Sequence, residues 1–284
     1  MADGRTGSIL SRTSRPTLLN NTRLTRDHII LSVIAMAYSS SNPVLSNRFW
    51  NNISGYETMS YEGTMQKIGI LFGTMLFSAL MLVSIGITVD MNILIVGTGI
   101  GFVGGFITYL ILLFSRPENP ATLMIAYAVF EGLMIGGFSL MFESMYDGIV
   151  FQAALGTVCI TGTMYGLYAT RIIKATPMFK KIIFTLVGGI MMLYLVSIVL
   201  FFLPGNFDVP FLHSSGPIGI LVTLVILAVA AFLLIINFDF IEKGIQQRSP
   251  KVGEWWGAFG LLVTIVWIYI EMLRLLAKVR SNFD

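Results

Sequence analysis

Charged residues are scarce in this sequence, and their scarcity excludes an ordinary soluble protein. Asp, Glu, Lys and Arg together make up 12% of the 284 residues, whereas 55% are hydrophobic and the mean hydropathy is +0.81. Soluble domains carry about 25% charged residues, so this chain has too few to cover a surface that faces water. The composition is typical of a protein that crosses a membrane several times.

Cysteine and histidine are also rare. The one cysteine, Cys159, excludes an intrachain disulfide and any metal site built from several cysteines. The two histidines, His28 and His213, lie outside the apolar runs that are long enough to span a membrane and far from the acidic residues within those runs. The chain has no HExxH or GxSxG motif, and its 16 methionines are scattered, as expected for side chains that fill core gaps. We therefore predict a protein that is not an enzyme and has no cofactor.

Long apolar runs are abundant, and a helix needs about 20 such residues to cross the hydrocarbon layer. Seven runs qualify: residues 68–88, 93–114, 121–142, 149–170, 182–203, 217–240 and 255–277. They are continuous rather than alternating, which favours helices over a barrel. The sequence thus predicts an all-α integral membrane domain of seven transmembrane helices over residues 67–280.

The second run contains ILIVGTGIGFVGG at residues 93–105, which includes the GxGxxG pattern of dinucleotide-binding loops. A dinucleotide site also needs a βαβ unit and an acidic residue about 20 positions later, whereas this run continues as apolar sequence and then RPENP. Gly97, Gly101 and Gly105 recur every fourth residue and therefore share one face of a helix. This spacing lets a second helix approach closely, and we interpret the three glycines as a packing face within the chain.

Basic residues predict the orientation, because cytoplasmic loops are enriched in Lys and Arg. If the first span starts in the cytoplasm, the inner loops hold eight basic residues and the outer loops hold none apart from His213. The eight are Arg116, Arg171, Lys174, Lys180, Lys181, Lys243, Arg248 and Lys251. Arg274, Lys278 and Arg280 would lie on the outer side, so either the C-terminus is outside despite its charge or the last helix does not fully cross.

Residues 1–66 are polar and differ from the rest of the chain. Several arginines precede the apolar run HIILSVIAMAY, which is too short to span a membrane. A basic region, an apolar core and Ala35-x-Ala37 fit a signal peptide. The alternatives are a cytoplasmic tail and a true start at Met36. In each case we expect this partly disordered segment to lie outside the membrane domain.

Three acidic residues lie within the predicted spans: Glu131, Asp239 and Glu271. An ionisable group at the centre of a spanning helix costs about 2.5–3.5 kcal/mol on insertion scales and usually faces a cavity or a partner. We predict that these three line an ion pathway and sense pH.

A structural role is the alternative for each acid. Glu131 can be protonated and bonded to a neighbouring helix. Asp239 lies near the inner end of its span, with Glu242 on the same helix face, and can reach interfacial water. Glu271 can be neutralised by Arg274 three residues later.

Six segments form a combination that is more specific than any one of them. They are SSNPVLS (residues 40–46), EGLMIGGFSLMFE, YDGIVFQAALGT, YGLYATRIIKATPMFKKI, FDFIEKG and IYIEMLRLLAKV. Together they resemble the Bax inhibitor-1 family of membrane proteins over about residues 40–280, and SSNPVLS is similar to a bacterial branch of it. The resemblance implies seven helices with the last one central among the other six, in the cytoplasmic membrane of a bacterium.

The resemblance also implies a site. Members of the family are described as pH-sensitive calcium leak channels whose sensor is one acid on the sixth helix and one on the seventh. The motifs match Phe238-Asp239-Phe240 and Ile268-Tyr269-Ile270-Glu271, with Glu where the family usually has Asp. A basic residue on an early helix, which contacts the acid pair in some members, has no match in residues 93–114. Arg171 is the candidate for its role.

Two carboxyl groups held close together would share a proton, and losing it would attract Ca²⁺. The spacing of the pair raises a difficulty, because Glu271 would lie about 24 Å from the inner face and Asp239 close to it. Glu131, at mid-depth, is the alternative partner of one of them.

We therefore predict a pH-sensitive, calcium-permeable leak channel with transient calcium at Asp239 and Glu271 and no structural metal. Its partners would be the lipid bilayer, protons and calcium ions, and its N-terminus would be cytoplasmic. The alternative is a non-conducting regulator that binds another membrane protein, such as a protease. No nucleic-acid partner is expected, because the basic residues belong to the membrane loops.

Overall fold

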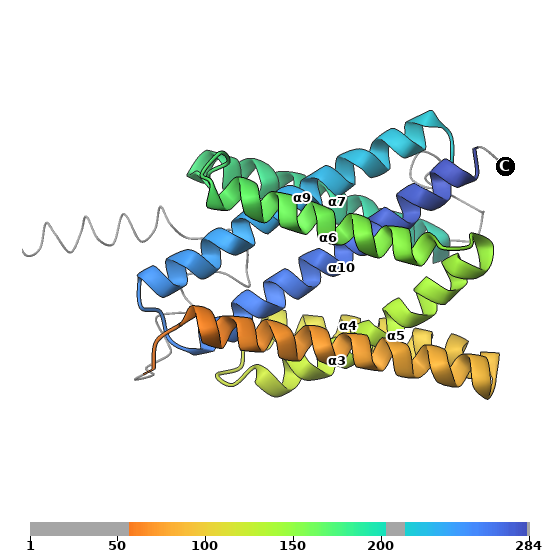
Figure 1. Cartoon of the computed structure of the whole chain (residues 1–284), viewed down its shortest axis with the longest axis horizontal. Helices are drawn as coiled ribbons and strands as arrows, with labels where there is room; N and C mark the ends of the chain where they lie inside the picture. The colour runs from red at the N-terminus through yellow and green to blue at the C-terminus, as the bar shows by residue number, and fades with distance from the viewer. Residues whose placement is uncertain (1–56, 203–213, 283–284) are drawn as a thin grey trace, which may run out of the picture. The chain divides into compact units, whose positions relative to one another are not determined.

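The computed structural model describes residues 57–202 and 214–282 (Figure 1). Within these ranges the chain forms seven helices and no strand: α3 (Tyr61–Thr88), α4 (Met91–Ser115), α5 (Ala121–Met145), α6 (Ile149–Ala169), α7 (Pro177–Phe202), α9 (Pro217–Gln246) and α10 (Val252–Arg280). All seven are long and apolar enough to cross a membrane, which confirms the predicted all-α membrane fold. The predictions for Met36, His28, residues 40–46 and His213 fall outside the described residues.

Several helices extend beyond the apolar runs that predicted them. α3 begins at Tyr61 because Ser60 caps it, its Oγ accepting a hydrogen bond of 3.0 Å from the backbone N–H of Gly63. The segment before α3 also pairs with the loop before α10, through Met59 N to Ser249 O at 2.8 Å. Hydropathy alone does not detect such polar first turns.

Two groups of helices are joined by α10. α3, α4 and α5 pack against one another, while α9 packs against α6 and α7. α10 contacts α3 and α5 in the first group and α6 and α9 in the second. Figure 1 shows α10 running between the two groups, so the last helix has the central position that was expected of it.

Small residues let α5 approach its neighbours closely. A Cβ on Gly101 of α4 would lie 2.5 Å from the backbone N of Met134 and 2.6 Å from the carbonyl O of Phe130, both on α5. A Cβ on Gly97 would lie 2.4 Å from the side chain of Leu82 on α3, so this glycine is also closely packed. Gly105 has looser surroundings, because a Cβ there would lie 3.4 Å from Glu131 and 3.7 Å from Phe130.

Large apolar side chains lie on the outside as well as in the core. Leu80 of α3, Val96 of α4 and Leu195 of α7 are examples that are more than half exposed, whereas Trp256 and Leu262 of α10 are fully buried. Seven spanning helices with an exposed apolar surface belong to a multi-pass membrane protein that contacts the lipid bilayer.

Candidate functional site

A cavity of about 1330 Å³ lies between α4 and α5 on one side and α7, α9 and α10 on the other. Along α10 it extends from Phe259 to Lys278, roughly 28 Å at a rise of about 1.5 Å per residue. The cavity therefore runs along most of the roughly 30 Å hydrocarbon thickness. Most of its wall is apolar or aromatic, with polar groups at a few positions.

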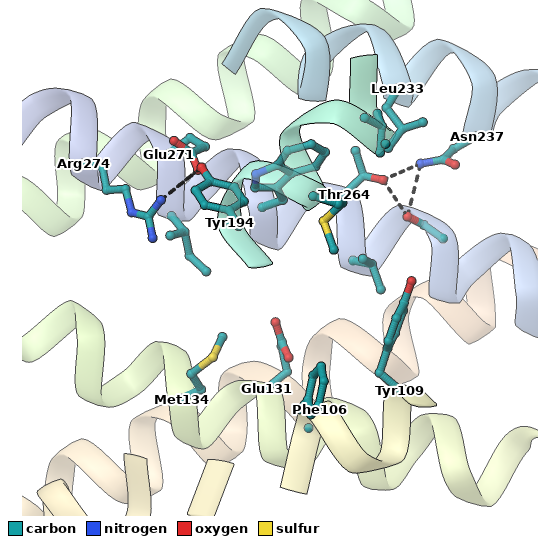
Figure 2. Close-up of a pocket in the computed structure, with 18 of the residues that line it drawn as sticks. Phe106, Tyr109, Glu131, Met134, Tyr194, Leu233, Asn237, Thr264, Glu271 and Arg274 are labelled. Carbon is teal, nitrogen blue, oxygen red and sulfur yellow. Dashed lines mark hydrogen bonds and ion pairs between the residues drawn. The ribbon is translucent and has the colours of Figure 1, made fainter. Parts of the chain in front are cut away.

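Two carboxylates lie on opposite walls of this cavity. Glu131 comes from α5 and Glu271 from α10, and both line the cavity. Figure 2 shows Glu131 pointing into the space from one helix group while Glu271 lies across from it in the other. Both residues are buried, at 8% and 1% exposure. The cavity thus brings together two of the three acids that the sequence singled out.

Glu131 and Glu271 differ in their partners. Tyr127, one turn before Glu131 on α5, hydrogen-bonds to its carboxylate, and no ion pair joins Glu131 to another described residue. Glu271 has a cation beside it, because Arg274 Nη1 lies 3.3 Å from its Oε1. The Tyr194 hydroxyl of α7 also donates to the same oxygen at 2.5 Å. The predicted local pair of Glu271 and Arg274 is therefore present, with a tyrosine from a different helix added to it.

Arg274 is held by the same tyrosine. Its Nη1 donates to the Tyr194 hydroxyl at 3.1 Å, and its guanidinium lies 5.3 Å from the centre of the Tyr194 ring. Tyr194 thus connects α7 to Glu271 and Arg274 of α10. Among the described residues, this is the first of the polar contacts that hold α7 against the other helices.

The second contact is at the opposite end of α7 and involves Asp239. Its Oδ2 accepts an ion pair from Lys180 of α7 at 2.6 Å and another from Lys243, one turn later on α9, at 2.8 Å. Asp239 is 5% exposed but does not line the cavity. Two lysines balance its negative charge, and it does not share a proton with a second acid.

The structure does not bring Asp239 and Glu271 together. Asn237 of α9 lies level with Gly260 and Thr264 of α10, to which its Nδ2 donates at 3.1 and 2.7 Å. Glu271 lies two turns beyond Thr264, about 10 Å farther along α10, whereas Asp239 lies on the other side of Asn237. Because of this offset, the two acids have separate partners and no common proton site.

Comparison with known families identifies the chain. Residues 42–281 match the family described as Bax inhibitor 1 like. The protein belongs to that family. Comparisons with curated proteins and with solved structures give no match. The match covers all seven helices and begins within SSNPVLS, so the resemblance seen in the sequence is confirmed.

In this Bax inhibitor 1 like protein, Arg171 does not pair with Asp239 or Glu271, the two acids that the family resemblance implies. It forms an ion pair with Glu242, which also accepts a hydrogen bond from the Tyr168 hydroxyl. The hydrogen bond to Glu242 raises the pKa of the Arg171 guanidinium above its ordinary value. This cluster joins the end of α6 to α9 next to Asp239, outside the cavity.

A further buried acid, Glu254 in the first turn of α10, is not among the three acids predicted from the sequence. It is fully buried and accepts hydrogen bonds from the backbone N and the Oγ of Ser60, both at 2.9 Å, and an ion pair from Lys67 of α3. Glu254 lies just before the apolar run that predicted the last span, so hydropathy assigned it to a loop. It fixes the start of α10 against the start of α3.

No group of three or more His, Cys, Asp or Glu side chains within residues 57–202 and 214–282 could hold a metal ion. Transient calcium at Asp239 and Glu271 therefore stays a prediction. The cavity carboxylates are separate oxygen ligands of the type that calcium prefers, each on a different helix.

Proposed function

We propose that this protein is a pH-sensitive, calcium-permeable leak channel of a bacterial cytoplasmic membrane, with its N-terminus in the cytoplasm. One observation carries the proposal: Glu131 and Glu271 lie on opposite walls of a cavity that runs along most of the central helix. Buried carboxylates that face a shared cavity within a membrane are typical of ion and proton pathways.

In this mechanism the carboxylates act through their charge. When both are ionised they attract a divalent cation into a surrounding of low dielectric, where the attraction is stronger than in water. Protonation removes that attraction, so the leak decreases as the pH falls. Glu271 differs from Glu131 in that Arg274 balances its negative charge. The full charge of Glu271 is available to a cation only when the two side chains separate.

Asp239 is assigned a supporting role in the proposal. It holds the first turn of α7 through Lys180, and α7 forms one wall of the cavity. Loss of this ion pair would release the first turn of α7 and change the position of the wall. Asp239 therefore influences the leak without binding the ion in the cavity.

The test is calcium flux into proteoliposomes at an acidic and at an alkaline pH. We expect greater flux at the alkaline pH for the wild type, and a much weaker pH dependence for Glu131→Gln and Glu271→Gln. Glu143→Gln is the matched control, since Glu143 is on the same helix as Glu131 but bonds to the backbone N–H groups of Gly148 and Val150 outside the cavity. Wild-type flux that ignores both cavity substitutions would contradict the proposal.

A second candidate function is a non-conducting membrane regulator that binds another membrane protein, such as a protease. The observation that favours it is the presence of Arg274 and Lys278 along the cavity, because two cations there oppose the passage of a third. Absence of calcium flux at both pH values, in a protein shown to be folded, would select this alternative.

A further inference from the structure

The cavity is open to one side at mid-depth of the helices. Phe102 and Phe106 of α4 and Met191 of α7 line it, yet they are 52%, 58% and 54% exposed. These three residues lie in the middle part of their helices, more than two turns from either end. In a membrane that level is occupied by acyl chains, so the opening faces lipid rather than water.

The two sides of the opening are not packed together. α4 packs against α3 and α5, whereas α7 packs against α9. Figure 2 shows the side chains of Phe106, Tyr109 and Met134 on one side of the space and those of Tyr194 and Leu233 on the other. An apolar chain can therefore enter between α4 and α7 and lie against α10.

The charges along the cavity favour an anion at one end. At this end Arg274 and Lys278 line the cavity along with Glu271, so the three formal charges sum to a positive one even with Glu271 ionised. Lys278 also donates to the carbonyl of Gly219 and the hydroxyl of Thr223 on α9, at 3.2 and 3.0 Å, which fixes its position at this end. Arg274 and Lys278 are both in the last two turns of α10, the level at which lipid headgroups begin. Arg is well suited to phosphate, because it has five N–H donors, and the hydrogen bonds of Arg274 to Glu271 and Tyr194 come from Nη1.

We propose that an anionic phospholipid binds here, with its phosphate at Arg274 and Lys278 and one acyl chain inside the cavity. Between Arg274 and Phe259 the cavity extends for roughly 22 Å at about 1.5 Å per residue, more than the roughly 15 Å of one leaflet of hydrocarbon. The chain lies along Val263 and Trp267 of α10 and ends at the rings of Tyr127 and Phe259, whose centroids are 5.0 Å apart. The acyl chain would occupy the same cavity as the ion of the proposed leak, so the two occupants exclude one another, but lipid binding does not itself require conduction.

The experiment uses the full-length protein in nanodiscs that contain a trace of phosphatidylglycerol with a photoreactive diazirine in its acyl chain. Irradiation and peptide mapping then locate the label. α10 is enclosed by α3, α5, α6 and α9, so labelling of Val263 or Trp267 requires a chain within the cavity. We expect label on these residues in the wild type, and at least severalfold less with phosphatidylcholine carrying the same diazirine.

Two neighbouring glycines of α7 provide a matched pair of variants. Gly188 lines the cavity and Gly189 does not, and a Cβ at either position would have no atom within 4 Å. Gly188→Trp should fill the cavity and remove most of the α10 label, while Gly189→Trp should leave it unchanged. Lys278→Gln should lower the phosphatidylglycerol label to the level of phosphatidylcholine.

Three results would overturn the proposal. The first is label confined to the lipid-facing residues of α3, α4 and α7 in the wild type. The second is equal loss of label in Gly188→Trp and Gly189→Trp. The third is equal labelling by the two lipids. None of these measurements uses calcium flux, so the lipid site and the leak are tested separately.

Discussion

Asn237 of α9 donates a hydrogen bond of 2.7 Å from its Nδ2 to the Oγ1 of Thr264 on α10. Neither side chain carries a charge, and both are buried. The family resemblance suggested that acids from the sixth and seventh helices would meet, but at this level the two helices meet through an amide and a hydroxyl. An amide and a hydroxyl do not titrate near neutral pH, so this contact cannot sense pH. The candidates for the pH sensor of the proposed leak are therefore the cavity carboxylates Glu131 and Glu271.

Thr264→Val tests how much this neutral contact contributes. The substitution keeps the shape of the side chain but removes the acceptor for Asn237, and hydrogen bonds between membrane helices contribute about 0.6 kcal/mol on average and up to about 1.7. We expect a lower melting temperature in detergent, by about 2–4 °C for each kcal/mol lost. Thr161→Val is the control, because the Thr161 hydroxyl bonds only to the carbonyl of Thr157 in its own helix. Equal shifts in the two variants would contradict the prediction.

The helices were predictable from the sequence because the bilayer imposes length and hydropathy on each span. The runs at residues 121–142 and 149–170 closely match α5 and α6. Polar contacts between helices were not predictable, since they depend on how the helices are rotated against one another. In the sequence, Tyr194 is one tyrosine within an apolar run and Lys180 is one of several loop charges. In the structure, Tyr194 links α7 to Glu271 and Lys180 links it to Asp239.

Gly101→Ala tests the close packing of α4 on α5. The added methyl group would lie 2.5 Å from the backbone N of Met134, so the two helices must separate, at a cost of about 1–3 kcal/mol. Gly99→Ala, in the same GxGxxG stretch, meets no atom within 4 Å and should be neutral or stabilising by up to about 1 kcal/mol, because alanine favours a helix. The measurement is reversible unfolding in mixed micelles. A stable Gly101→Ala would mean that α4 and α5 are less closely packed than described.

Lys67→Met tests the buried ion pair between α3 and α10. Lys67 is 12% exposed in its side chain and Glu254 is fully buried, so the substitution leaves an uncompensated carboxylate. Breaking such a pair costs about 3–5 kcal/mol. Lys251→Met is the comparison, because its partner Glu57 is exposed and the pair is accessible to water, so unfolding should not change measurably. If Lys67→Met and Lys251→Met unfold alike, Glu254 does not fix the start of α10.

Arg274→Gln tests whether a cation along the cavity limits the leak. A divalent and a monovalent cation about 10 Å apart repel by about 3 kcal/mol at an effective dielectric constant of about 20, and 1.4 kcal/mol corresponds to a tenfold change in rate. The substitution also leaves Glu271 without its cation. We therefore expect calcium flux at alkaline pH to increase roughly a hundredfold, and the increase to disappear in Arg274→Gln combined with Glu271→Gln. Arg280→Gln is the control, since Arg280 is on the same helix but bonds to the carbonyl of Asp147 and to Gln152, away from the cavity. An equal increase in Arg274→Gln and Arg280→Gln would assign the effect to surface charge, and unchanged flux in Arg274→Gln would show that the ion does not pass Arg274.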